Sequence, residues 1–89
     1  MASRRLKLEN IKGLPARASA KLVELVEGFD AEATISKDGE SANGDSIMGL
    51  LMLAASIGTF IDVKTSGPEA EALSNAIADL VADKFGEGN

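Results

Sequence analysis

The residues Asn10–Gly28, NIKGLPARASAKLVELVEG, place a glycine and a proline before apolar residues at helical spacing. Pro15 suits the first turn of a helix, because its ring fixes φ near the helical value and its missing N–H would have no partner there. Gly28 is predicted to cap the other end in a left-handed conformation. We therefore expect a loop over Asn10–Leu14 and an amphipathic helix from Pro15 to about Glu27. Its buried side would comprise Ala18, Leu22, Leu25 and Val26.

Strand patterns lie on both sides of this helix. RLKLE, residues Arg5–Glu9, alternates apolar and charged side chains and predicts a half-buried strand with Leu6 and Leu8 on one face. Within Ala31–Asn43, the stretches AEATISK and ESAN are joined by Asp38–Gly39, a strong hairpin signal. The sequence therefore predicts a β-hairpin here. Its inward residues on the first strand would be Ala31, Ala33 and Ile35.

The second half of the chain predicts a helix, a strand and a last helix. GDSIMGLLML predicts a short helix through about Leu53, whose N-cap is either Asp45 or Ser46. IGTFIDVKTSG follows as a strand, and Gly67 with Pro68 begins the last helix. The apolar side of that helix would comprise Leu73, Ile77, Leu80 and Val81.

The resulting order of elements, β-α-β-β-α-β-α, predicts an α+β fold. Three helices and four strands favour an antiparallel sheet that is covered on one face only, which is an open-faced α/β sandwich. No repeat or linker interrupts the pattern, and 89 residues suit one modest core. Residues 1–89 are therefore predicted to form a single domain.

The composition excludes several classes of function. The chain has no Cys and no His, so it offers no disulfide, no thiolate metal site and no imidazole for catalysis. We accordingly expect neither a metal nor a cofactor. The net charge of −5, with three Phe and neither Trp nor Tyr, opposes binding to nucleic acid.

Nothing in the sequence predicts a membrane segment or a signal peptide. The most apolar run, Ile47–Ala55, is far shorter than the about 20 residues that span a bilayer. The N-terminal segment MASRRLKLEN becomes polar too soon for a signal peptide. We therefore expect a cytoplasmic protein that does not associate with membranes.

Three motifs resemble the HPr family, the phosphocarriers of the bacterial phosphoenolpyruvate-dependent phosphotransferase system. They are KGLPARASAKLVE, GDSIMGLLMLAA and GTFIDVKTSGPEAEAL, in this order along the chain. The resemblance implies sheet order 1-4-2-3 with three helices on one side, and a monomeric carrier rather than an enzyme. It also implies enzyme I and downstream phosphoryl acceptors as partners. The amino-acid sequences of the first two motifs are most similar to those of the nitrogen-related branch, and the choice between that branch and sugar transport stays open.

The first motif departs from the family pattern at one position. The family reads Gly-Leu-His-Ala-Arg, with the histidine accepting the phosphoryl group, and this chain has Pro15 in its place. Arg17 and the amides of Ala16 and Ala18 retain an anion site at the helix start. Proline within a chain has no nucleophilic atom, so this chain is predicted to be unable to carry phosphate. Whether Pro15 is natural or introduced stays open. Outside the motif, Arg17 would be an ordinary solvated residue.

The second motif supports an alternative function. Ser46 aligns with the serine that an HPr kinase phosphorylates in many family members, and Ile47, Met48 and Leu51 match the apolar docking surface. A phosphate on Ser46 would place about −1.5 to −2 charges beside that surface. The alternative is therefore a regulatory binding module that carries no phosphoryl group. The residues alone predict an ordinary N-cap and core packing.

Overall fold

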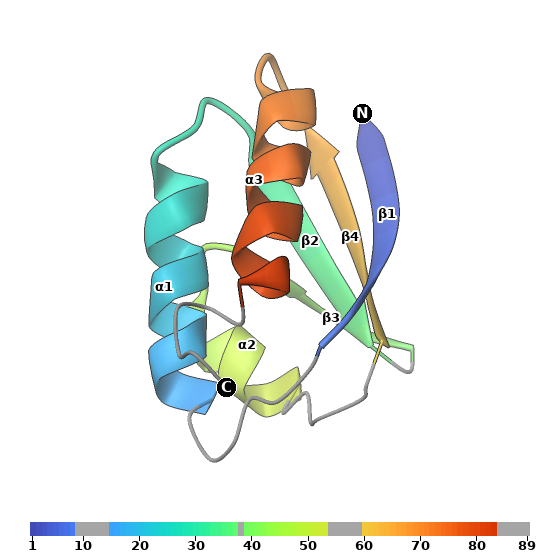
Figure 1. The fold of residues 1–89 in the computed structure, drawn as a ribbon. Helices are drawn as coiled ribbons and strands as arrows, with labels where there is room; N and C mark the ends of the chain where they lie inside the picture. The colour runs from blue at the N-terminus through green and yellow to red at the C-terminus, as the bar shows by residue number, and fades with distance from the viewer. Residues whose placement is uncertain (9–14, 38, 54–59, 84–89) are drawn as a thin grey trace.

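The computed structural model describes residues 1–8, 15–37, 39–53 and 60–83. The strands of the described chain form one antiparallel sheet in the order β1-β4-β2-β3. Three helices cover one face of this sheet and leave the other open (Figure 1). The predicted α+β open-faced sandwich, its order of elements and its strand order are confirmed. The elements are β1 (Ala2–Lys7), α1 (Pro15–Glu27), β2 (Glu32–Lys37), β3 (Glu40–Asn43), α2 (Ile47–Leu53), β4 (Phe60–Ser66) and α3 (Ala70–Ala82).

Strand β1 begins three residues earlier than predicted and ends at Lys7. It pairs with β4 from Ala2, opposite Thr65, to Lys7, opposite Phe60. Apolar alternation alone missed the first part, because Arg4 occupies an inward position there. The guanidinium of Arg4 forms hydrogen bonds in this inward position. Its Nε donates to Ser74 Oγ at 2.9 Å, and its Nη2 donates to Asn75 Oδ1 at 2.7 Å.

The predicted face of β1 is correct. Leu8 is buried and Leu6 is half-buried against the core. Glu9 and the predicted loop Asn10–Leu14 lie outside the described residues.

Helix α1 has the predicted bounds and buries more of its surface than predicted. Of the predicted stripe, Ala18, Leu22 and Val26 are buried and Leu25 is half-buried. Ser19 and Val23 are buried as well, because α1 packs against both α2 and α3. The predicted left-handed cap at Gly28 is wrong, since its φ is not positive. Its N–H instead donates to the carbonyl of Leu25 at 3.1 Å, and the N–H of Phe29 donates to that of Val26 at 3.2 Å. These three-residue hydrogen bonds tighten the last turn and satisfy two carbonyls there.

The hairpin of β2 and β3 is confirmed. Gly39 has φ of +85°, a conformation that the turn requires and that glycine adopts without a steric penalty. Asp38, the other predicted turn residue, lies outside the described residues. Ala33 and Ile35 are buried and Ala31 is half-buried, as the alternation predicts.

Helix α3 begins at Ala70, so the prediction that Gly67 and Pro68 begin it is wrong. Gly67 has φ of +110° and its carbonyl accepts from the N–H of Ala70 at 3.1 Å, which makes a turn before the helix. The buried hydroxyl of Thr65 donates to the carbonyl of Ala70 at 2.7 Å. The end of β4 therefore fixes where α3 starts.

The core lies between the sheet and the helical layer. Burying one Val, Leu or Ile side chain contributes about 1.5 to 3 kcal/mol, so these contacts dominate the stability of the fold. The buried cluster comprises Leu8, Ala18, Leu22, Val23, Val26, Ala33, Ile35, Leu50, Ile61, Val63, Leu73, Ile77 and Val81.

Candidate functional site

The first turn of α1 carries the residues predicted to bind phosphate. Pro15 is the first helical residue, as the sequence predicts. The backbone N–H groups of Ala16 and Arg17 belong to this first turn, at the positive end of the helix dipole. Arg17 is exposed to solvent and Ala18 is buried, so side-chain access at this turn comes from the arginine.

Ser46 is the N-cap of α2. Its Oγ accepts from the N–H of Gly49 at 3.1 Å, and its carbonyl accepts from the N–H of Leu50 at 3.0 Å. Asp45, the other predicted cap, is exposed and stands one residue outside. The half-buried hydroxyl of Ser46 therefore lies at the start of α2.

Three residues of α2 form what is called the α2 patch: Ile47, Met48 and Leu51. Ile47 is 42% exposed and Met48 is 71% exposed, whereas Leu50 on the inner side of the same helix is buried. Leu51 is half-buried at the edge. Exposed apolar side chains that lie together are typical of interaction surfaces. Ser46 directly precedes this patch in the chain.

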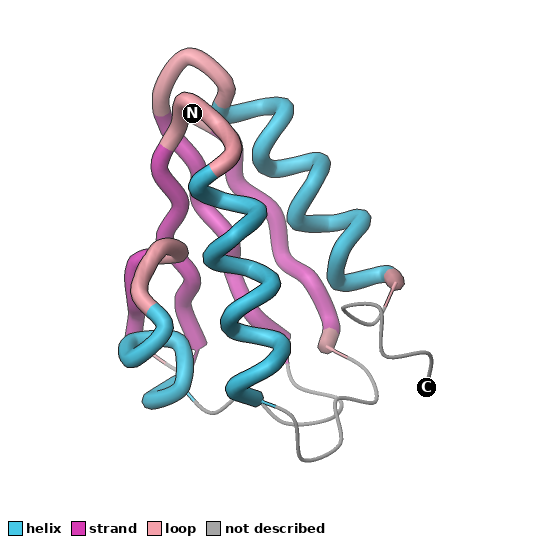
Figure 2. Tube along the Cα trace, turned by 90° about the vertical axis from the view of Figure 1, so that its left-hand side faces the viewer, coloured by secondary structure: helices cyan, strands magenta, loops and turns pink. Residues whose placement is uncertain are grey.

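The structure brings the two predicted regions to one end of the helical layer. Helix α1 packs against α2, and the first turn of α1 lies at the same end of the molecule as α2 (Figures 1 and 2). A partner that contacts Arg17 could therefore also contact the α2 patch. Sequence spacing could not establish this neighbourhood, because about 30 residues separate the two.

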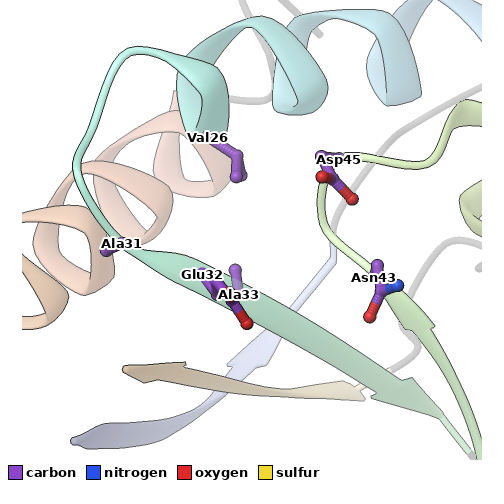
Figure 3. Close-up of a pocket in the computed structure, with 6 residues that line it drawn as sticks. All are labelled: Val26, Ala31, Glu32, Ala33, Asn43 and Asp45. Carbon is purple, nitrogen blue, oxygen red and sulfur yellow. The ribbon is translucent and has the colours of Figure 1, made fainter. Parts of the chain in front are cut away.

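A pocket of about 210 Å³ lies elsewhere. It is bounded by Val26 in the last turn of α1, which stands about 16 Å along the helix from Pro15. The carboxylate of Asp45 lies at its wall (Figure 3), and negative charge opposes binding of an anion. The pocket is therefore separate from the predicted phosphate site. Its lining residues are Val26, Ala31, Glu32, Ala33, Asn43 and Asp45.

The described residues contain no group of three or more Asp, Glu, His or Cys side chains placed to hold a metal ion. Among the helices they form, none is long and apolar enough to cross a bilayer.

Comparison with known proteins agrees with the fold. The family described as "PTS HPr component phosphorylation site" matches residues 2–83. The chain is 41% identical over 88 residues to phosphocarrier protein HPr of Cupriavidus necator, covering 99% of both chains. It is also 41% identical over 86 residues to phosphocarrier protein NPr of Shewanella violacea, covering 97% of this chain and 94% of the relative. The crystal structure of HPr-C-His from Thermoanaerobacter tengcongensis superposes with a TM-score of 0.91 at 32% identity, covering 98% of each chain.

The fold and these relatives define a small phosphotransferase-system protein, and the chain belongs to the HPr family. The resemblance predicted from the three motifs is confirmed. Members of this family are phosphocarriers and not enzymes. A relative named HPr and a relative named NPr are each 41% identical to this chain, so both kinds of phosphocarrier are represented among its relatives.

Proposed function

We propose that this chain docks on phosphotransferase-system proteins as an HPr-like protein but cannot itself carry a phosphoryl group. The observation that carries the proposal is Pro15 as the first residue of α1, where the family motif has the phosphoryl-accepting histidine. Two features of the same helical turn support this as the place where the family binds phosphate. Arg17 is exposed in the same turn, and the helix start offers N–H groups to an anion.

The chemistry follows from the proline nitrogen. Within a chain this nitrogen belongs to an amide without a proton, and its lone pair is delocalised into the carbonyl. It can neither attack phosphorus nor release a proton. A histidine at the same place would present a ring nitrogen as the nucleophile and, once phosphorylated, would hold the phosphate beside the helix start and Arg17.

The test compares the chain with its Pro15→His variant, each incubated with enzyme I and labelled phosphoenolpyruvate. The expected result is no label on the original chain and one acid-labile phosphoryl group on the variant. Label on the original chain would contradict the proposal. Failure of a correctly folded variant to accept label would count against an intact phosphate site, and a backbone NMR spectrum of the variant establishes its fold.

We propose enzyme I and the downstream phosphoryl acceptors as partners, bound through Arg17 and the α2 patch. Their position at one end of the helical layer supports a single docking surface. A chain that docks without accepting phosphate should compete with a functional HPr for enzyme I. The expected result is slower labelling of that HPr as this chain is added, with less inhibition by a Met48→Asp variant. Absence of competition would contradict docking.

A second function is favoured by the position of Ser46 beside the α2 patch. In this alternative the chain is a regulatory binding module: the hydroxyl of Ser46 attacks the γ-phosphorus of ATP on an HPr kinase, loses its proton, and ADP leaves. Incubation with such a kinase should add one phosphoryl group to the chain and none to a Ser46→Ala variant. An unchanged mass for the original chain would remove support for this role.

Three further properties belong to the same proposal. We expect one domain over residues 1–89, a cytoplasmic location and a monomer in solution. Light scattering after size exclusion tests the monomer directly. Comparison of binding to sugar-branch and nitrogen-branch acceptors would assign the branch.

A further inference from the structure

We propose that the open face of β1 and β4 binds an extended acidic segment of a partner protein. The contacts would come from Arg5, Lys7 and Lys64, here called the basic row. This surface is on the side of the sheet away from the helices (Figure 1), so it is separate from the docking surface at Arg17 and the α2 patch. The inference therefore does not depend on the proposed function.

The register of the sheet aligns the basic row. Arg5 and Lys7 are exposed on the same face of β1, and Lys64 is exposed on β4 opposite Ser3. With a rise of about 3.4 Å per residue, the three cations follow one another at intervals of about 7 Å along the strands. Alternate side chains of an extended peptide project from one face at that same interval. A segment with acidic residues at every second position would match the row.

Phe60 gives this surface an apolar element. It stands opposite Lys7 in the register and is 47% exposed. The guanidinium carbon of Arg5 lies 5.0 Å from the centre of its ring. This cation–π contact holds Arg5 against the sheet and reduces the side-chain freedom that binding would otherwise remove.

The charge of this face contrasts with the rest of the chain. The outward positions of β1 and β4 carry three cations and one acidic residue, Asp62, in a protein of net charge −5. Glu32 follows beyond the end of the row, opposite Ser66. Among the described residues, neither Lys7 nor Lys64 forms an ion pair or a side-chain hydrogen bond. Their charges are therefore available to an acidic partner.

A short acidic segment fits better than a nucleic acid or a membrane. Both of those are long or wide arrays of negative charge, which the remaining acidic surface of this chain would repel. A short segment presents its charge only to the basic row, and salt limits repulsion from charges more than about 10 Å away at 0.1 M ionic strength.

The test uses the full chain and a synthetic nine-residue peptide of alternating glutamate and threonine, followed by backbone NMR. We expect saturable shifts at the amides of β1 and β4 and little change at the start of α1 or in α2. A Lys7→Ser, Lys64→Ser double variant should bind about three- to tenfold more weakly, as the loss of two exposed ion pairs predicts. Asp62→Asn should bind about two- to threefold more tightly, because it removes the one opposing charge on these strands.

The matched control is a Lys21→Ser, Lys37→Ser double variant, which removes the same charge from other parts of the surface. It should bind the peptide as the original chain does. Equal weakening in both double variants would overturn the proposal, since the effect would then be one of net charge. The proposal would also be overturned if the glutamine version of the peptide bound equally well, or if phosphatidylserine vesicles or single-stranded DNA bound the face and the peptide did not.

Discussion

The backbone N–H of Asp30 donates to Oε1 of Glu69 at 2.6 Å, and the N–H of Glu69 donates to the carbonyl of Asp30 at 3.0 Å. This reciprocal pair joins the segment after α1 to the turn before α3, across 39 residues of sequence. It holds together the end of the molecule opposite the predicted docking surface.

Glu69→Ala removes one of these two hydrogen bonds and should lower the free energy of unfolding by about 1 kcal/mol, the usual contribution of such a bond. Urea denaturation followed by circular dichroism measures it. Glu24→Ala is the control, because it removes the same charge from an exposed position of α1. An equal loss in both variants would show that charge, and not this contact, is responsible.

Thr65 tests the link between β4 and the start of α3. Thr65→Val retains the shape of this buried side chain but removes the hydroxyl that donates to the carbonyl of Ala70. We expect a loss of about 1 to 2 kcal/mol in unfolding free energy, because a buried carbonyl loses a donor. Thr34→Val, on the open face of the sheet, should change stability by less than about 0.5 kcal/mol. Similar values for the two variants would contradict this role for the Thr65 hydroxyl.

Alanine variants at Gly67 and Gly39 distinguish the cost of backbone strain from the cost of steric crowding. Both have positive φ, so alanine at either position should cost about 1 to 2 kcal/mol of conformational strain. A Cβ at Gly67 would also stand 3.1 Å from the Cα of Ala31, whereas nothing lies within 4 Å of one at Gly39. Thermal unfolding should therefore show a larger loss for Gly67→Ala than for Gly39→Ala. The reverse order would contradict the close approach of Gly67 to Ala31.

Ser46→Ala should destabilise the protein by about 1 kcal/mol, because the N–H of Gly49 loses its acceptor. Asp45→Ala should leave the unfolding free energy nearly unchanged, since Asp45 is not the cap. Amide hydrogen exchange at Gly49 provides a local measurement, with faster exchange expected in the Ser46 variant alone. Faster exchange in the Asp45 variant would reassign the cap.

Arg17 can be tested only where a phosphoryl acceptor exists. In the Pro15→His background, Arg17→Ala should slow phosphorylation by enzyme I by about tenfold, a loss of about 1.4 kcal/mol for one charge-assisted contact. Lys21→Ala in the same background is the control for loss of positive charge on α1. The measurement is the initial rate of label transfer. An unchanged rate in the Arg17→Ala variant would contradict a role for Arg17 in binding the phosphate.

Much of the fold was predictable because its signals are local. The bounds of α1 follow from Pro15 and the apolar spacing after it, and the β2–β3 turn follows from the Asp-Gly pair. The candidate site followed from the motifs, since Pro15, Ser46 and Met48 each stand at a recognisable place within one. For Ser46 the pattern left Asp45 as an equal candidate, and the side-chain hydrogen bond to Gly49 distinguishes them.

The sequence by itself determined the order of elements, the inward faces of β1, α1, β2 and α3, and the absence of a phosphoryl-accepting side chain at position 15. Only the tertiary structure decided how far β1 extends, where α3 begins, and that α2 lies at the same end of the molecule as the start of α1. The physical reason is the range of the interactions. Periodicity and turn preferences act over a few residues. The hydrogen bond between Arg4 and Ser74 joins residues 70 apart in the sequence, and it forms, like the one between Asp30 and Glu69, only when the chain has folded.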